Sequence, residues 1–257
     1  MVINFYCKVV FRSREDCESD EKIVASSEAG YYVAYCDVDG KRKYAIFHEN
    51  GRQISNWFDD VSWSGLVSGA SKYYVARKNG REAIFDEKGN QVTEWFREIS
   101  WDSGLVLGLS DYYVASKYVA GKGCLKAIFN KNGKRVSDWF DDVLKEGLNL
   151  GQSNYYVAIK NGKEAIFDKD GNRVSGWFDS ILQSGLVEGK SSYYVAKKDY
   201  YYAVFDLEGN QITEWHADPH DLELFVREGS FEFGRNSFEV ASETKRNQRK
   251  RKSVLKP

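Results

Sequence analysis

The sequence predicts an all-β repeat protein, a β-propeller of four-stranded blades, with a closed five-bladed ring and an open β-array as the alternatives. One observation is an internal repeat with a basic period of 38 residues, a spacing typical of propellers, solenoids and arrays. The other is that the expected strands are apolar on both faces, as in residues 73–76 and 83–85. A sheet is buried on both faces when each blade lies between two others.

The repeat is marked most clearly by its tryptophans, which lie at intervals of 38, 44, 38 and 38 residues. They are Trp57, Trp95, Trp139, Trp177 and Trp215. The extra residues of the longer copies fall between the YYVA and AIF motifs, at 37–43 and 118–126. Insertions confined to one connection predict a surface loop at that connection.

Each unit is expected to contain four short strands, formed by the motifs GLVxG, YYVAxK, AIF and xVSxWF. Asn79-Gly80 and Asn161-Gly162 predict two-residue type I′ turns between the second and third strands. A glycine late in the next turn, as in DEKGN, predicts a type I turn followed by a left-handed glycine. Helical periodicity is absent, so we expect little or no helix.

A single repeat domain is expected over residues 1–242. The repeats cover roughly 23–61, 62–99, 100–143, 144–181 and 182–215. The flanking segments 1–22 and 216–242 each resemble part of a repeat. We expect them to share a composite sixth blade, which would close the ring and hide two strand edges. Residues 243–257 form a basic tail that we expect to be flexible.

The charges are unevenly distributed along the chain. The formal net charge is −1, but the tail carries about +6 and the remainder about −7. The four cysteines form no CxxC pair, and we expect them to be free and buried rather than disulfide-bonded. The sequence has no leader-like start and no apolar run of about 20 residues. These features predict a soluble, cytoplasmic protein without membrane contact.

The pattern NGKxAIFDxxGNxVSxWFDxIxxxGLVxG resembles the WG-repeat family over about residues 23–215. The chain departs from the family at its namesake Trp-Gly, where Glu82-Ala83 and Tyr44-Ala45 stand, and its tryptophan lies in the WF(D) motif instead. The resemblance implies repetitive β-structure and a role in binding or scaffolding without catalysis. It carries no catalytic residues that could be transferred to this chain.

Three repeats place a carboxylate directly after the Trp-Phe pair, and a lectin could use such residues to stack sugar rings and bond their hydroxyls. The candidate ligand-binding residues are Trp57, Asp59, Trp139, Asp141, Trp177 and Asp179. The alternative is that the rings pack between blades while the aspartates cap turns. The other two repeats have Arg97 and Ala217 in place of the acid, and this loss favours packing.

No set of residues suited to catalysis recurs in the sequence. The serines of the Gly-x-Ser-x-Tyr motif lack the last glycine of a nucleophile elbow; they are Ser71, Ser110, Ser153 and Ser191. The turn that begins at Asp168 lacks the spacing of a calcium loop. His216 and His220 flank Pro219, which opposes the helix that a metal-binding pair at this spacing needs. We therefore expect no enzyme activity, no cofactor and no metal.

The basic tail is the strongest signal outside the repeat, because clustered Lys and Arg can neutralise phosphates. Its candidate polyanion-binding residues are Lys245, Arg246, Arg249, Lys250, Arg251 and Lys252. We expect a non-catalytic repeat platform that mediates protein–protein interaction or assembly, with a tail that contacts RNA, another polyanion or an acidic partner. The alternative is a multivalent glycan-binding lectin.

Overall fold

Five small antiparallel sheets make up the computed structural model, which describes residues 22–26, 29–182, 185–220, 222–223 and 226. Each sheet has three strands that are consecutive along the chain. Sheet one contains β1 (Lys22–Ser26), β2 (Tyr31–Val38) and β3 (Lys41–His48), and sheet two contains β4 (Asp60–Val61), β5 (Tyr73–Lys78) and β6 (Arg81–Asp86). Sheet three contains β7 (Glu98–Ile99), β8 (Tyr112–Val119) and β9 (Gly123–Asn130), and sheet four contains β10 (Asp142–Val143), β11 (Tyr155–Lys160) and β12 (Lys163–Asp168). Sheet five contains β13 (Ser180–Leu182), β14 (Tyr193–Lys198) and β15 (Tyr201–Asp206). A single helical turn, α1 (Gly104–Leu107), precedes β8.

The turn motifs adopt the conformations that the sequence predicts. Asn79 and Gly80 have φ angles of 53° and 70° between β5 and β6, as a type I′ turn requires. Gly89 follows β6 with a φ angle of 84°. The Gly89 amide donates a hydrogen bond to the carbonyl of Asp86 at 2.9 Å, and the Asp86 amide donates to the carbonyl of Asn90 at 3.0 Å. The chain therefore reverses after β6 through a turn closed by a left-handed glycine, and both predicted turn types are confirmed.

The segment that follows each hairpin joins two sheets. In the first repeat, bridges between Phe47 and Gln53 and between Tyr44 and Phe58 hold this segment beside β3. The segment then crosses to sheet two, where β4 pairs with β5. The same path recurs at the later junctions. The expected fourth strand of each blade is therefore wrong. The xVSxWF segment makes isolated bridges to its own sheet, and residues that follow it form the edge strand of the next sheet.

The GLVxG motifs are turns rather than the first strands of blades, and in the third repeat this stretch forms α1. Gly65 has a φ angle of 77°, a left-handed conformation that strands do not use. A Cβ atom on Gly65 would lie 2.1 Å from the carbonyl oxygen of Tyr73. The glycine thus lets the turn approach β5 closely, while Leu66 and Val67 enter the core.

The hydrophobic core lies between consecutive sheets. Val33 and Ile46 of sheet one pack with Tyr74 and Phe85 of sheet two, and Phe58 from the connecting segment lies in the same cluster. The Phe58 and Phe85 ring centroids are 5.0 Å apart, and the corresponding pairs at the next three junctions are 4.9, 5.0 and 5.1 Å apart. The predicted burial of both sheet faces is confirmed, because each inner sheet packs against a neighbour on either side.

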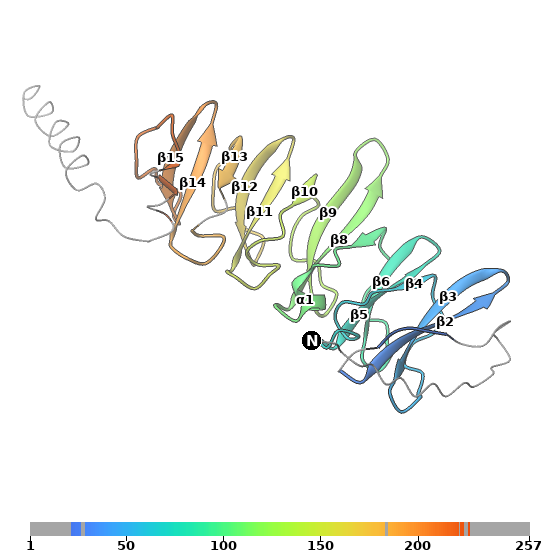
Figure 1. The fold of residues 1–257 in the computed structure, drawn as a ribbon. Coiled ribbons are helices and arrows are strands. Elements are labelled where there is room, and N and C mark those ends of the chain that lie inside the picture. The colour runs from blue at the N-terminus through green and yellow to red at the C-terminus, as the bar shows by residue number, and fades with distance from the viewer. Residues whose placement is uncertain (1–21, 27–28, 183–184, 221, 224–225, 227–257) are drawn as a thin grey trace, which may run out of the picture.

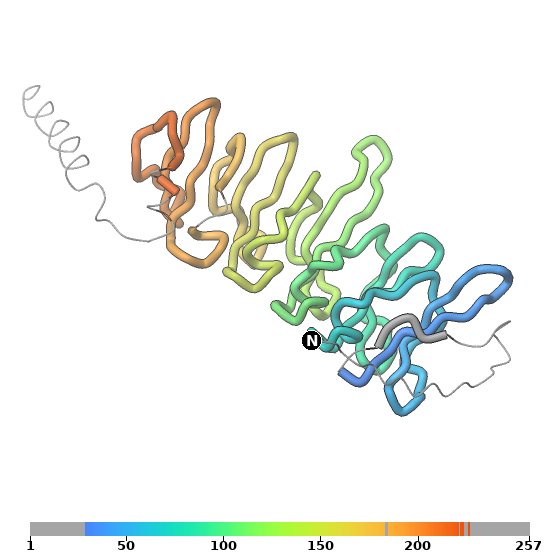
Figure 2. Tube along the Cα trace, in the orientation of Figure 1, coloured from blue at the N-terminus to red at the C-terminus, as the bar shows by residue number. Residues whose placement is uncertain are grey.

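The five sheets stand face to face in an open row (Figure 1). Figure 2 shows that sheets one and five lie at opposite ends of this row. The predicted all-β repeat fold is confirmed, and its open arrangement (Figure 1) matches the open β-array among the alternatives. The expected composite blade involves residues 1–22 and 216–242, most of which lie outside the described residues. Leu222 and Val226 are described, and they cover the outer face of sheet five.

Cys36 in β2 is buried and disulfide-bonded, whereas Cys124 in β9 is free and exposed. Cys36 is therefore buried as expected but not free, and Cys124 is free as expected but not buried. Within the described part of the chain, no helix is long and apolar enough to span a membrane.

Candidate functional site

The aspartates that follow the Trp-Phe pairs cap turns of the next repeat. The carboxylate of Asp59 accepts a hydrogen bond from the Asn79 amide at 2.6 Å. That amide begins the two-residue turn between β5 and β6. The equivalent pairs are Asp141 with Asn161, at 2.6 Å, and Asp179 with Asp199. Turn capping therefore explains the acid in all three repeats, although the capped turn lies one repeat further along the chain than the sequence suggests.

Two of these aspartates also form ion pairs within their own repeat. Lys43 pairs with Asp59, and Lys163 pairs with Asp179. The hydrogen bond from Lys43 lowers the pKa of Asp59, and the hydrogen bond from the Asn79 amide adds to this effect against the opposing influence of partial burial. Both carboxylates are thus held in their charged form by the surrounding donors.

The repeated tryptophans pack against their own sheets. Each ring meets the phenylalanine of its AIF motif edge-on, with centroids 6.0 Å apart for Trp57 and Phe47 and 5.8 Å apart for Trp139 and Phe129. Trp177 packs in the same way, and the guanidinium of Arg173 lies 5.9 Å from its centroid. The rings and carboxylates considered as lectin residues are therefore already engaged in packing, cation–π contacts and turn capping.

Other residues singled out from the sequence hold local structure. The hydroxyl of Ser71 accepts a hydrogen bond from the Tyr73 amide at 3.1 Å. Asp168 accepts hydrogen bonds from the amides of Asp170 and Asn172 at 2.9 and 2.8 Å, so the calcium-like loop is a hydrogen-bonded turn. No group of three or more potential metal ligands occurs among the described residues, which include both histidines of the WHADPHD motif.

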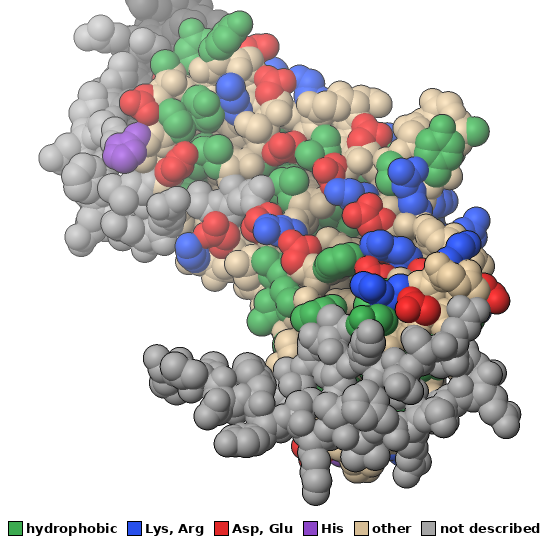
Figure 3. Space-filling view, turned by 45° about the vertical axis from the view of Figure 1, so that its right-hand side comes forward, with side chains coloured by type: hydrophobic (Ala, Val, Ile, Leu, Met, Phe, Trp, Pro, Cys, Tyr) green, Lys and Arg blue, Asp and Glu red, His purple; other side chains and the backbone are tan. Residues whose placement is uncertain are grey.

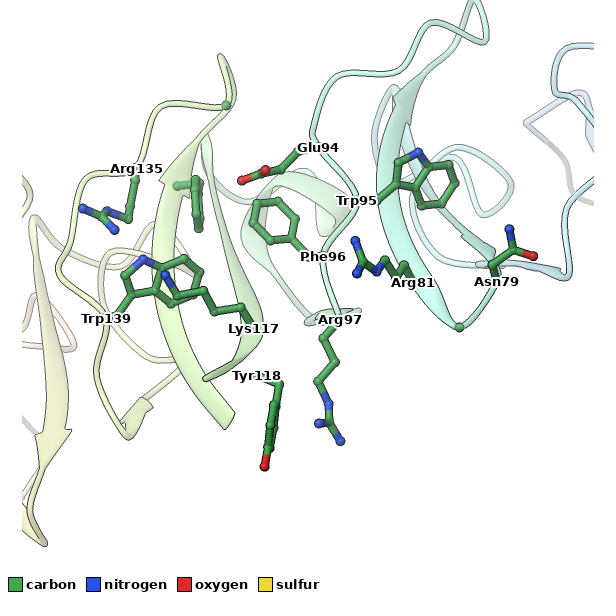
Figure 4. A pocket seen from close by; sticks show the side chains of 13 residues that line it. Asn79, Arg81, Glu94, Trp95, Phe96, Arg97, Lys117, Tyr118, Arg135 and Trp139 are labelled. Atoms are coloured by element: carbon green, nitrogen blue, oxygen red, sulfur yellow. The ribbon is translucent and has the colours of Figure 1, made fainter. Parts of the chain in front are cut away.

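A cavity of about 930 Å³ opens between sheets two and three (Figure 4), and we call it the junction pocket. Its main lining side chains are the cations Arg81, Arg97, Lys117 and Arg135 and the aromatic rings Tyr118 and Trp139. Glu94 is an acidic residue in the lining. The volume is within the range of roughly 300–1,000 Å³ that is typical of ligand sites.

The junction pocket lies where the repeat departs from its own pattern. Arg97 stands at the position that Asp59 holds in the first repeat, and Tyr118 stands at the position of Asn79, whose amide Asp59 caps. The strands of the β8–β9 hairpin have 8 residues, against 6 in the β5–β6 hairpin, so the turn has moved away from Arg97. The Arg97 guanidinium lies 5.9 Å from the centroid of the Tyr118 ring instead. A cation–π contact has thus replaced the capping hydrogen bond.

A second charge change accompanies the first. In sheet one, Lys43 and Asp59 flank an antiparallel bridge and form an ion pair across it. The equivalent bridge in sheet two is flanked by Arg81 and Arg97. Sheet two therefore brings two cations together at positions where sheet one pairs opposite charges.

Aromatic rings, rather than acids, contact three of the four cations of the junction pocket, Arg97, Lys117 and Arg135. The Nζ atom of Lys117 lies 4.0 Å from the centroid of Trp139, and the Arg135 guanidinium lies 5.8 Å from the same ring. In the described part of the chain, none of the four cations takes part in an ion pair. On the face drawn in Figure 3, basic and acidic side chains are intermingled. The excess of positive charge is therefore a local property of the pocket.

Sequence reasoning found Trp139 but missed the four cations around it. In the sequence, Arg97 stands where three other repeats have an aspartate, and Tyr118 belongs to an insertion. The two changes are connected, because Arg97 and Tyr118 stand at the positions where the preceding repeats have Asp59 and Asn79, the capping carboxylate and the amide that it caps. The tail candidates within 243–257 lie outside the described residues.

No family model matches the chain, and no curated protein matches it. Among solved structures, Hsv2 of Kluyveromyces lactis is 14% identical, with 72% of this chain and 61% of that chain covered and a TM-score of 0.34. A structure described as a eukaryotic initiation factor is 10% identical, with 78% and 55% covered and a TM-score of 0.41. The chain thus spans less than two thirds of both. At such low TM-scores and identities, neither structure indicates what this chain binds or does.

Proposed function

We propose that the protein is a non-catalytic repeat platform that binds a partner protein at the junction pocket. The observation that carries the proposal is the charge arrangement there. Arg81 and Arg97 flank one bridge, form no ion pairs among the described residues, and line the same cavity. Equivalent positions in sheets one and four form ion pairs and cap turns. One junction has therefore given up a stabilising arrangement, and a binding role accounts for the change.

Two exposed tryptophans also support a platform function. Trp63 and Trp101 occupy the same position in successive connections, and they are 50% and 48% exposed. The Arg77 guanidinium lies 5.8 Å from the centroid of Trp101. Trp and Arg are the residue types that most often dominate binding energy in protein interfaces.

Four side chains of types that often serve catalysis, two serines and two aspartates, are engaged in local structure. The hydroxyls of Ser110 and Ser153 donate to carbonyl oxygens of the following repeat at 2.6 and 2.7 Å. Asp86 and Asp168 hold their own turns through amide hydrogen bonds. These roles support a binding function rather than an enzymatic one, and they agree with the scaffolding role that the resemblance to the WG-repeat family implies.

The platform is tested by affinity purification of the tagged full chain from its native source. We expect a protein that co-elutes with the chain at a fixed ratio in size-exclusion chromatography. Recovery of the chain alone, in repeated purifications at low salt, would contradict the proposal. The tail, with Lys245 to Lys252, is proposed as an additional contact to RNA or another polyanion; ribonuclease treatment of the purified material tests this contact.

A multivalent lectin remains the second candidate, because aromatic rings and carboxylates recur together at Trp57, Trp139 and Trp177. A glycan array probed with the purified chain distinguishes the two functions. We expect no sugar class to bind, since the three aspartates cap turns. Micromolar binding to one sugar class would support the lectin instead.

A cytoplasmic location stays a prediction. The disulfide bond of Cys36 counts against it, because disulfides are rare in reducing compartments. Alkylation of free thiols in the native source, followed by mass spectrometry of the Cys36 peptide, tests the location. An unmodified, oxidised Cys36 would point to an oxidising compartment.

A further inference from the structure

We infer that the junction pocket binds an acidic peptide segment of a partner protein, with carboxylates of that segment seated at Arg81 and Arg97. The inference rests on the platform function proposed above and names the chemistry of its partner. It follows from the charges of the pocket, the state of its aromatic rings and the placement of its cations.

The net positive charge of the pocket lining favours an anionic ligand. Four cations and one carboxylate, Glu94, line the cavity. Like charges opposite each other in a sheet are destabilising, so Arg81 and Arg97 gain most from a ligand that neutralises both. Guanidinium groups bind carboxylates through paired hydrogen bonds in a fixed planar geometry, which suits the two arginines to carboxylate recognition.

The aromatic rings favour a peptide over a single-stranded nucleic acid. Nucleic-acid sites of this kind stack bases on open aromatic faces. Here Lys117 and Arg135 both contact the Trp139 ring, and Arg97 contacts Tyr118. A base would have to displace these cations, whereas a carboxylate binds them where they stand. The rings hold the cations and give apolar contact to the aliphatic parts of a peptide.

The cations are spread across two sheets, so a chain-like ligand can meet them in succession. Arg81 begins β6, Arg97 directly precedes β7, Lys117 lies in β8, and Arg135 follows β9. In Figure 4, Lys117 and Arg135 lie beside Trp139 on one side of the pocket, and Arg81 lies on the other side, near Trp95. An extended segment with several acidic residues can contact both groups at once.

The test measures fluorescence anisotropy of labelled octaglutamate against the purified full chain, with octaglutamine and an eight-nucleotide oligouridylate as comparison probes. We expect octaglutamate to bind, to weaken as salt is added, and to bind more tightly than either comparison probe. Arg97→Asp should weaken octaglutamate binding by at least about tenfold, because it removes one charge-assisted contact and adds a repelling carboxylate. Arg52→Asp, which makes the same change in net charge at an exposed turn of sheet one, should change binding by less than about twofold.

A second pair of variants controls for the cation–π contact. Arg135 and Arg173 stand at the same position of two repeats, and each lies near its own tryptophan, at 5.8 and 5.9 Å. Arg135 lines the junction pocket and Arg173 does not. Arg135→Gln should weaken octaglutamate binding by roughly threefold, and Arg173→Gln should leave it unchanged. Both changes introduce the glutamine that three other repeats carry at this position, so both variants should fold.

Three results would overturn the inference. Octaglutamate could fail to bind the wild-type chain, or it could bind Arg97→Asp and Arg52→Asp equally, as contact through the tail alone would produce. Oligouridylate could instead bind more tightly and lose affinity with Arg97→Asp, which would make the pocket a nucleic-acid site. The platform function is judged separately, since a protein recovered at a fixed ratio with the tagged chain would uphold it even where octaglutamate fails.

Discussion

Arg81 and Arg97 flank one antiparallel bridge in sheet two, at the two positions where Lys43 and Asp59 form an ion pair in sheet one. Like-charged neighbours across a sheet cost up to about 1 kcal/mol, and the contact of Arg97 with Tyr118 offsets part of that cost. The two repeats can therefore be compared directly, because Asp59 stabilises the fold in the first repeat, whereas Arg97 at the equivalent position lines a cavity.

The capping role of Asp59 predicts a loss of stability when its carboxylate is removed. Asp59→Ala leaves the Asn79 amide and Lys43 without their acceptor and should lower the free energy of unfolding by about 1 kcal/mol. Urea unfolding followed by tryptophan fluorescence measures the change. Arg97→Ala is the matched control, since Arg97 caps no turn, and it should cost less. An equal cost for both variants would contradict the capping role.

Acid should weaken the fold through the same carboxylates. The Lys43 hydrogen bond lowers the pKa of Asp59, and the Lys163 hydrogen bond lowers that of Asp179. A carboxylate whose pKa is lower in the folded state stabilises the fold above its unfolded pKa, near 3.9. That contribution is lost as the pH falls through the folded pKa. We expect unfolding free energy to fall more steeply below about pH 4 in the wild type than in Asp59→Asn. Equal pH dependence of the unfolding free energy in the wild type and Asp59→Asn would contradict this explanation.

Phe58 should be among the most sensitive core positions, because it is shared by two sheets. Its ring is 3% exposed and lies 5.0 Å from that of Phe85. Phe58→Ala should cost about 3–5 kcal/mol by the loss of buried surface and the cavity that remains. Trp63→Ala, at a half-exposed ring, should cost about 0.5 kcal/mol or less. Similar losses for the two variants in chemical unfolding would argue against a core shared between sheets.

Tyr113 offers a site where removing a polar group should do little harm. Its ring is fully buried, its hydroxyl has no hydrogen-bond partner among the described residues, and burial raises its pKa. Tyr113→Phe removes a desolvated group that gains nothing in return, so stability should stay within about 1 kcal/mol of the wild type or rise. A larger loss in urea unfolding would show that the hydroxyl makes an essential bond.

Much of the fold follows from local sequence features. Asn79-Gly80 predicts its turn because both residues tolerate positive φ angles, and the double-sided apolar strands predict stacked sheets. The prediction of a strand at the GLVxG motif is wrong because a two-residue apolar run carries no periodicity, and the left-handed conformation of Gly65 is not visible in a sequence. The sequence predicts the open row only as an alternative to a closed ring, since the angle between sheets depends on how rings such as Phe58 and Phe85 pack.

The candidate site was only partly predictable for a related reason. The sequence shows that Arg97 replaces an acid and that residues 118–126 contain an insertion. It does not show that Asp59 reaches forward to Asn79, so the link between Arg97 and Tyr118 required the register of the strands. Arg81 belongs to the candidate site because the bridge between Glu82 and Phe96 places it opposite Arg97, and this pairing is not visible in the sequence.

Paired thermal melts of the wild type and Arg97→Asp, each with and without octaglutamate, test the central claim most directly. Arg97→Asp restores the charge pattern of sheet one, so its melting temperature without peptide should be higher by a few degrees, corresponding to roughly 0.5–1 kcal/mol. Peptide should raise the melting temperature of the wild type, because it binds the folded state, and should raise that of Arg97→Asp clearly less. An Arg97→Asp chain that melts below the wild type and is stabilised by the peptide as much as the wild type would contradict the account.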